Sequence, residues 1–464
     1  MKIDPSSSRS EPGSVPRPNP NWFLVRGAGI TMLALVLVWR APQFAVLGVA
    51  LMVLAAQEWV RFRRAEERWV QSQTDPEALR PEAATANNVK ETLPALLVSR
   101  RARQVGAVDW TTARSWLGGA PRLGTTPWPR SEADGRPLPF LAQIDLSEVR
   151  EKIGPSPLPA SGSLAFFVGD KPVIYVPEQP LSTPVSQPPA DSPTLEEAGY
   201  GGIGIVVWPK DPLGPRLFPF WPVDLCVAPT EVRGRTSSFH AREAFRVLED
   251  EPAPQWWHSA IHLADCLRIA TTFGVPNKIR VQRQGVTDPQ RLAVAEAFQK
   301  GIPTFEQFVA EVAEWTRDRD PWALLGPTDV GRLANFFERA SEEFGEYTRF
   351  CLPHSLDDLA TATLLALATA EDRGFAALPP QVRRLINEKY LLPAGDAHMM
   401  FGQVIDVQGG AAEEAECNYL LLRLNHDDMV HWSFGDAGAY HFFISPDDLA
   451  KRNWAGARMT FECG

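Results

Sequence analysis

Four side chains that can bind a metal ion lie close together between residues 255 and 272. His258, His262, Asp265 and Cys266 occupy positions i, i+4, i+7 and i+8, so a helix here would place them on one face. Imidazole, carboxylate and thiolate groups are all zinc ligands, and two histidines one turn apart can chelate one ion. The spacing makes a zinc site one interpretation of this helix; the structural alternative below is favoured, so the sequence predicts no cofactor, with zinc as the one candidate.

The alternative for this helix is an ordinary buried face whose histidines are hydrogen-bonded. The intervening residues are mostly apolar, and Trp256 and Trp257 lie beside them. The sequence contains no HExxH motif, so the glutamate base of a zinc protease is missing. Phosphate-loop and GxSxG nucleophile motifs are also absent from the sequence.

A second group of polar side chains gathers near the C-terminus. Such groups could bind a cation or act as acids and bases. Hairpin tips are polar for structural reasons too, because an aspartate in a turn bonds its own backbone. We therefore expect mainly structural roles, and we keep Asp436 as a candidate binding residue. The group consists of His426, Asp427, Asp428, His431, Asp436 and His441.

Gln143 and Asp145 form a third candidate. They alternate with Phe140, Ala142 and Ile144, which gives an expected strand one polar face. A buried polar pair needs partners, so the two side chains either line a pocket or bond a neighbouring loop. The loop interpretation is favoured, and Gln143 and Asp145 remain candidate binding residues.

The elements that position these residues fall into three stretches. Short apolar runs with period two predict strands at 138–146, 162–170, 171–178, 202–210 and 217–229, with a proline- and serine-rich loop at 179–199. Apolar residues at three- and four-residue spacing predict helices between 237 and 390. Strands return at 417–428 and 431–449. Together they indicate an α+β fold: an antiparallel sheet body with a large helical insertion.

Individual helix ends can also be predicted. Thr287 or Asp288, Thr304 and Ser355 are expected to cap helix N-termini, and Gly301 is suited to a helix end. The segment from 288 to 318 is therefore expected to hold two helices. Residues 61–109 are charged and rich in helix-forming residues, which predicts a helix and then a connector.

The N-terminus suggests a membrane anchor. A proline- and serine-rich tail, expected to be disordered, occupies 1–21 and is followed by two apolar runs within 22–60, separated by Arg40-Ala41-Pro42. These runs predict a two-helix transmembrane hairpin, although each is short for a span. Basic residues outside the hairpin predict a two-pass protein of the bacterial inner membrane with both ends cytoplasmic. A cleaved secretory signal and a re-entrant hairpin are the alternatives.

Charge and cysteine content limit the partners. The net charge is −10, although residues 1–56 carry five basic and two acidic side chains. An acidic body argues against nucleic-acid binding, because phosphate contacts require a basic surface. The five cysteines are scattered and form no CxxC pair, which argues against a disulfide framework or zinc ribbon. The bilayer and a protein of unknown identity are therefore the expected partners.

Two stretches of the chain together resemble the bacterial YwqG-like family, a family of unknown function. The first contains Gly118-Gly119-x-Pro121, Trp128-Pro129, the run Pro137-Leu138-x-Phe140 to Leu146, and Gly162-x-Leu164-x-Phe166-Phe167. The second contains His398 to Gly402, Leu420-Leu421-Leu422-x-Leu424, Gly435-Asp436-x-Gly438, Phe442-Phe443-Ile444 and Asp448-Leu449. The resemblance implies an α+β fold in which both halves build one antiparallel assembly. It implies no activity, and a link to toxin and immunity systems for some members.

The sequence thus predicts a tail at 1–21, a transmembrane hairpin at 22–60 and a connector at 61–109. It then predicts a β-rich part at 110–236, a helical insertion at 237–392 and a second β-rich part at 393–464. The function hypothesis is a membrane-anchored, non-enzymatic interaction module. The alternative is a metal-dependent hydrolase that uses His258, His262 and Asp265 or the polar hairpin around Asp436.

Overall fold

A computed structural model describes residues 92–106, 112–195, 197–198, 214–229, 255–283, 288–389, 398–435 and 438–463. All of them belong to one compact unit, Lys90–Gly464. Its strands are β1 (Leu96–Arg100), β2 (Trp116–Leu117), β3 (Phe140–Asp145), β4 (Ser163–Phe167), β5 (Val173–Val176), β6 (Trp221–Val227), β7 (His398–Met400), β8 (Tyr419–Asn425), β9 (Ala439–Ile444) and β10 (Arg458–Glu462).

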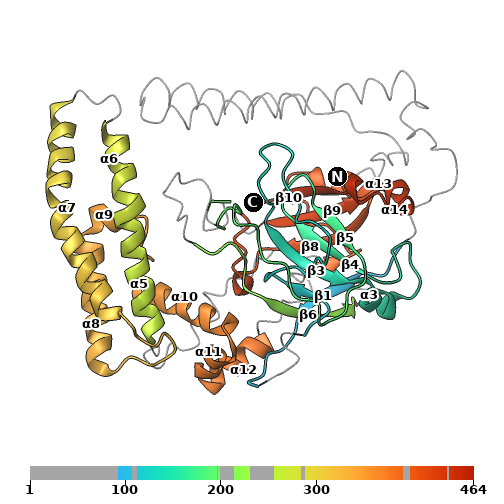
Figure 1. Ribbon diagram of the computed structural model, residues 1–464, viewed down its shortest axis with the longest axis horizontal. Helices are drawn as coiled ribbons and strands as arrows, with labels where there is room; N and C mark the ends of the chain where they lie inside the picture. The colour runs from blue at the N-terminus through green and yellow to red at the C-terminus, as the bar shows by residue number, and fades with distance from the viewer. Residues whose placement is uncertain are drawn as a thin grey trace, which may run out of the picture. The chain divides into compact units, whose positions relative to one another are not determined.

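The strands form one ten-stranded antiparallel sheet (Figure 1). Its order is β10-β9-β8-β7-β1-β6-β2-β3-β4-β5. β1 pairs with β6 on one side and with β7 on the other, so it joins the N-terminal and C-terminal groups of strands. The expected assembly of both halves into one antiparallel sheet is therefore observed, with β1 as the link between them.

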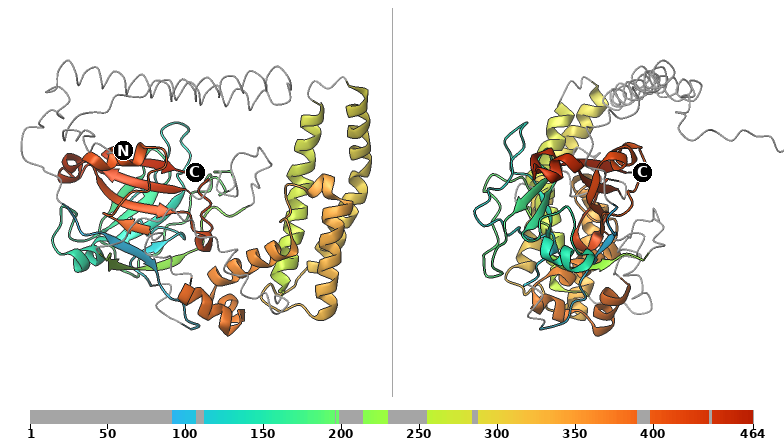
Figure 2. Two further views of the ribbon diagram at one scale, coloured as in Figure 1. Left: turned by 180° about the vertical axis from the view of Figure 1, so that it is seen from behind. Right: turned by 90° about the vertical axis from the view of Figure 1, so that its right-hand side faces the viewer.

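The sheet curls until its two ends face each other, like a barrel that is not quite closed (Figure 2). Phe166 on β4 and Phe442 on β9 meet edge to face, with ring centroids 5.1 Å apart, although six strands separate β4 from β9 in the sheet order. Tyr175 on β5 stacks on Trp454, which follows β9, at 5.9 Å. Such contacts between distant strands require strong twist and curvature.

The helices were expected between 237 and 390, and most of those described lie there. They are α3 (Leu146–Ile153), α5 (Trp257–Ile269), α6 (Val275–Arg283), α7 (Pro289–Thr316), α8 (Pro327–Glu338), α9 (Gly345–Thr348), α10 (Leu356–Thr369), α11 (Asp372–Ala377), α12 (Pro380–Lys389), α13 (Gly410–Cys417) and α14 (Pro446–Ala450). Two π-helical turns, η4 (Ala270–Gly274) and η5 (Arg339–Glu343), and two 3₁₀ turns, η6 (Asp428–Val430) and η7 (Trp454–Gly456), complete the set.

The strands and helices pack into two separate apolar cores, the sheet core and the helical core. The sheet core includes strand residues together with Leu364 and Leu367 of α10, Phe375 of α11 and Val382 of α12. The helical core is built by α5 to α9 and is rich in aromatic rings. Leu359 of α10 belongs to this second core, so α10 contributes to both. The junction between the two cores therefore runs along α10 and the start of α5.

The fold-class prediction needs correction at the N-terminus. In the part of the chain that the structure describes, no helix combines the length and apolar character needed to cross a bilayer. This finding contradicts the predicted transmembrane hairpin, and with it the two-pass inner-membrane localisation. Residues 22–60, from which both predictions came, lie outside the described residues.

Two further elements differ from expectation. Leu96–Arg100, expected in a charged helix and connector, is strand β1 at the centre of the sheet. The two helices expected between 288 and 318 are one continuous helix, α7, which passes through Gly301 and Pro303. Its buried residues Phe298, Phe305 and Phe308 lie on both sides of Pro303, so packing of the whole face overrides the local helix-breaking signal. Asp288 and Ser355 cap their helices as predicted.

Candidate functional site

A fully buried ion pair joins β1, β7 and the segment that follows β8. Asp427 Oδ1 lies 3.3 Å from Arg100 Nη1, and its Oδ2 lies 3.1 Å from His398 Nε2. His398 Nδ1 accepts a hydrogen bond from the Asn425 backbone N–H at 3.1 Å, so the proton of the neutral ring is on Nε2 and points to Asp427. Both ring nitrogens are thus occupied, and neither His398 nor Asp427 is solvent-exposed.

The electrostatics of this trio are those of a structural ion pair. Burial alone would raise the pKa of Asp427, but the Arg100 charge and the His398 hydrogen bond outweigh it and lower the pKa. Burial lowers the pKa of His398 more than Asp427 raises it. A histidine without a free nitrogen and without solvent access cannot act as a general base on a bound substrate.

Other buried polar side chains of the sheet accept hydrogen bonds from backbone N–H groups. Glu462 on β10 accepts hydrogen bonds from the N–H groups of Val407, Gln408 and Ala411 at 3.1, 2.6 and 2.9 Å. His441 Nε2 accepts from Ile405 N–H at 3.0 Å, and burial lowers its pKa to about 3. These contacts hold the segment before α13 against β9 and β10. The side chains of Glu462 and His441 therefore have a structural role.

The predicted candidates Gln143 and Asp145 also contact the protein itself. The Gln143 side-chain oxygen accepts from Arg122 N–H at 2.7 Å, and its amide donates to Ser163 Oγ at 2.6 Å. Asp145 caps α3 by accepting from Glu148 N–H at 2.9 Å. Gln143 thus bonds a neighbouring loop, and Asp145 starts a helix.

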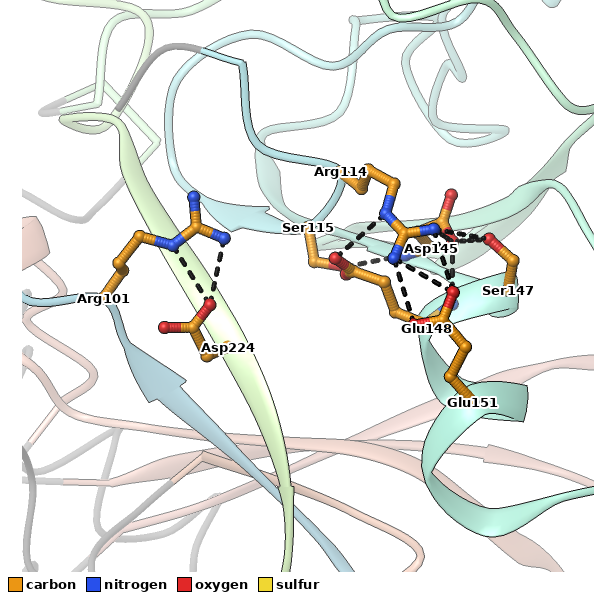
Figure 3. A network of polar contacts seen from close by, with 8 residues as sticks. All are labelled: Arg101, Arg114, Ser115, Asp145, Ser147, Glu148, Glu151 and Asp224. Carbon is orange, nitrogen blue, oxygen red and sulfur yellow. Dashed lines mark hydrogen bonds and ion pairs between the residues drawn. The ribbon is translucent and has the colours of Figure 1, made fainter. Parts of the chain in front are cut away.

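A polar network surrounds Asp145 at the start of α3 (Figure 3). The Arg114 guanidinium contacts Glu148 and Glu151, each at 3.2 Å. The Ser115 hydroxyl donates to Glu148 and accepts from Asp145 N–H at 2.9 Å. Burial raises the pKa of Glu148 against the opposing effects of Ser115 and Arg114. A hydroxyl beside such a carboxylate resembles an activated nucleophile, but Ser115 is completely buried and cannot reach a substrate.

The first two predicted metal ligands do lie together on α5. The rings of His258 and His262 are both half-buried, and their centroids are 6.4 Å apart. His258 stacks on Trp322 at 5.6 Å with an interplanar angle of 12°, and its Nδ1 lies 3.3 Å from Thr363 Oγ1 on α10. Burial lowers the pKa of His258 to about 4, helped by the charges of His262 and His431. Burial also lowers the pKa of His262, so both rings are neutral at pH 7.

The other two predicted ligands point elsewhere. Asp265 is exposed, and its carboxylate lies 3.5 Å from Arg268 Nε. Cys266 is buried in the face of α5 that packs inward. Across the described ranges, no three histidine, cysteine, aspartate or glutamate side chains are grouped so that they could hold a metal ion. Asp436 lies outside the described residues.

Several exposed apolar side chains lie where α6 ends and α7 begins. We call this region the hairpin tip and define it as Arg280, Val281, Arg283 and residues 288–294. Its aliphatic side chains are Val281, 62 % exposed, Leu292, 44 % exposed, and Val294, 63 % exposed. Every described residue from 288 to 294 is exposed, so the first two turns of α7 extend beyond the helical core. Figures 1 and 2 show α6 and α7 side by side.

Sequence reasoning missed both the Arg100–Asp427–His398 trio and the hairpin tip. The trio joins segments more than 300 residues apart, and only the cluster of polar residues around Asp427 indicated it. The tip was detectable as a helix start, Asp288-Pro289, followed by apolar residues without a buried partner.

Comparison with known proteins gives one family match. The model of a domain of unknown function (DUF1963) matches residues 115–188 and 327–463. No curated protein matches the chain. The matched segments contain β2 to β5, β7 to β10 and α8 to α14, whereas α5, α6 and α7 lie between them. The chain is therefore similar to this family over most of its sheet and its later helices, and the hairpin of α6 and α7 lies outside that similarity.

Proposed function

We propose that this protein is a non-enzymatic binding module that docks an acidic protein partner on its hairpin tip. The observation that carries the proposal is the exposure of Val281, Leu292 and Val294 on neighbouring helix ends. Exposed aliphatic side chains are unfavourable in water, and several of them in one region can mark an interaction site. Elsewhere in the helical segment, α7 buries its aromatic residues in the helical core, so the tip is where its apolar pattern is left uncovered.

Charge indicates the kind of partner. Arg280, Arg283 and Arg291 are exposed and lie close in sequence to the apolar residues. The carboxylate nearest to them in sequence is Asp288, 3.9 Å from Arg291. Residues 284–287 between the two helices carry no charge. A basic rim on a chain of net charge −10 favours an acidic partner and disfavours self-association.

The polar groups of the sheet support a non-enzymatic role. His398, Asp427, His441 and Glu462 are buried and hydrogen-bonded to protein groups. A metal-dependent hydrolase would require a third ligand and a base beside His258 and His262, and the described part of the chain offers no such grouping. The binding proposal requires none of these groups to react.

A finer family assignment accompanies this proposal. The two segments that match the family model include both stretches that resemble the YwqG-like family. That resemblance supports a YwqG-like assignment and suggests a toxin or immunity protein as the partner class.

The test is affinity capture with the full chain and two variants. The first variant carries Val281→Ser, Leu292→Ser and Val294→Ser. The second is a matched control, Leu181→Ser with Val185→Ser, because these side chains are 53 % and 41 % exposed in a loop after β5. We expect one acidic protein to bind the wild type and the control, to bind more weakly in high salt, and to be lost from the tip variant. A partner retained by the tip variant would contradict the proposal.

A further inference from the structure

We propose that His258 and His262 bind a late first-row divalent metal ion, such as Zn²⁺ or Cu²⁺, as a two-histidine chelate on α5. This inference is independent of the proposed docking function. It also differs from the four-ligand site expected from the sequence, because Asp265 and Cys266 take no part in it.

The first support is the tautomer of His258. Thr363 donates its one hydroxyl hydrogen to the Leu359 carbonyl at 3.1 Å. In the arrangement that we infer, its oxygen accepts the two remaining contacts, from Ser259 Oγ at 2.8 Å and from His258 Nδ1 at 3.3 Å. In this arrangement His258 carries its proton on Nδ1, which leaves the lone pair of Nε2 available to a metal ion.

The surroundings also orient the ring as in known metal sites. Metal-binding histidines usually donate their second nitrogen to an oxygen of the protein, which fixes both tautomer and orientation. Thr363 supplies that oxygen, and Trp322 stacks on the ring face at 5.6 Å. The hydrogen bond of His258 to Thr363 runs through Nδ1, and both rings are half-buried.

The spacing of the rings suits a shared ion after a small movement. With metal–nitrogen bonds of about 2.0–2.1 Å, two imidazoles on a tetrahedral ion have ring centroids roughly 5 Å apart. The observed separation is 6.4 Å with a tilt of 30°. Binding a shared ion therefore requires the His262 side chain to rotate toward His258.

The chemistry of the donors defines the ligand class. Two neutral imidazoles prefer Zn²⁺, Cu²⁺ or Ni²⁺ to Mg²⁺ or Ca²⁺, which bind oxygen ligands. Because only two protein ligands are provided, the remaining coordination positions hold water.

Metal binding is tested by equilibrium dialysis of the full chain against Zn²⁺, with metal analysis of the retained protein. We expect one bound Zn²⁺ per chain and an affinity lower by about tenfold or more in His258→Ala and His262→Ala. His354→Ala is the matched control, because His354 is an exposed histidine in the same helical segment. A wild type without bound Zn²⁺, or loss of binding in the control alone, would overturn the proposal.

A positioning variant and a spectrum make the test independent of folding defects. Thr363→Val removes the acceptor of the Nδ1 proton and should weaken binding by about tenfold, and Thr363→Ser should restore it. Electron paramagnetic resonance of wild-type protein with one equivalent of Cu²⁺ should show coupling to two imidazole nitrogens. Coupling to no nitrogen, or Thr363→Ser binding as weakly as Thr363→Val, would contradict the inference.

Discussion

The sheet and the helical segment bury polar groups in different ways. The sheet buries arginine, histidine, aspartate and glutamate side chains, including Arg100, Asp427, His441 and Glu462. Among the described residues from 255 to 389, the buried polar side chains are four hydroxyls: Ser259, Thr316, Thr348 and Thr363. The three threonines among them donate to carbonyls four residues earlier in their own helix or turn.

This difference indicates that the sheet and the helical segment have different roles. The buried charges of the sheet specify the fold, whereas the helical segment carries the proposed recognition surface. Buried charges need partners from distant segments, so they fix which strands lie together. The helical core is fixed by stacked aromatic rings, such as Phe308 on Phe344 at 4.8 Å, with Arg339 above Phe308 at 4.5 Å. The three buried threonine hydroxyls bond carbonyls nearby in sequence, so the helical core does not depend on buried charges from distant segments.

The largest effect is expected from breaking the buried ion pair. Asp427→Ala leaves Arg100 charged and buried beside His398, which should cost about 3–5 kcal/mol of unfolding free energy. Urea unfolding of the full chain measures it. Asp265→Ala, an exposed aspartate on α5, is the control and should change the free energy by about 0.5 kcal/mol or less. Equal effects would mean that the buried charges do not hold the sheet.

A loss of unfolding free energy of similar size, but confined to the helical segment, is expected from a substitution in the helical core. Phe305→Ala removes a fully buried ring stacked on Tyr347 at 4.8 Å, which should cost about 3–5 kcal/mol. Hydrogen exchange should accelerate in α5 to α8 while β3, β4 and β8 stay protected, because the two cores are distinct. Uniform acceleration across the sheet would show one cooperative core.

A smaller loss of stability is expected as the pH falls, because the buried histidines bind protons when the chain unfolds. Burial lowers the pKa of His441 to about 3, whereas an unfolded histidine titrates near 6.5. The unfolded chain therefore binds more protons between these values, so stability is full above pH 6.5 and decreases as pH falls. His441→Gln should reduce the slope by about 1.4 kcal/mol per pH unit between pH 6 and 4. An unchanged slope in His441→Gln would refute the assignment.

The sequence predicted local elements well and long-range partners poorly. The strands expected around Phe140, Phe166, Tyr175 and Leu422 all form, because alternation within a strand is a local signal. β1 was missed, since a short apolar run such as Leu96–Arg100 cannot be assigned to strand or helix by pattern alone. Its place between β6 and β7 depends on residues more than 100 positions away.

The same limit applies to the candidate sites. Helical spacing correctly placed His258 next to His262, because residues at i and i+4 share a face. It could not tell that Cys266 turns into the core while Asp265 reaches solvent, since burial depends on which helices pack against α5. The partners of Gln143 and Asp427 come from distant loops and strands, which a single sequence does not reveal.

The most direct test of the division between sheet and tip is hydrogen exchange of the full chain with and without its captured partner. The exposed first turns of α7 should exchange rapidly in the free protein. We predict that the partner slows exchange at the end of α6 and at residues 288–294, and leaves the sheet strands unchanged. Slowing confined to the sheet, with no change at the hairpin tip, would contradict the account.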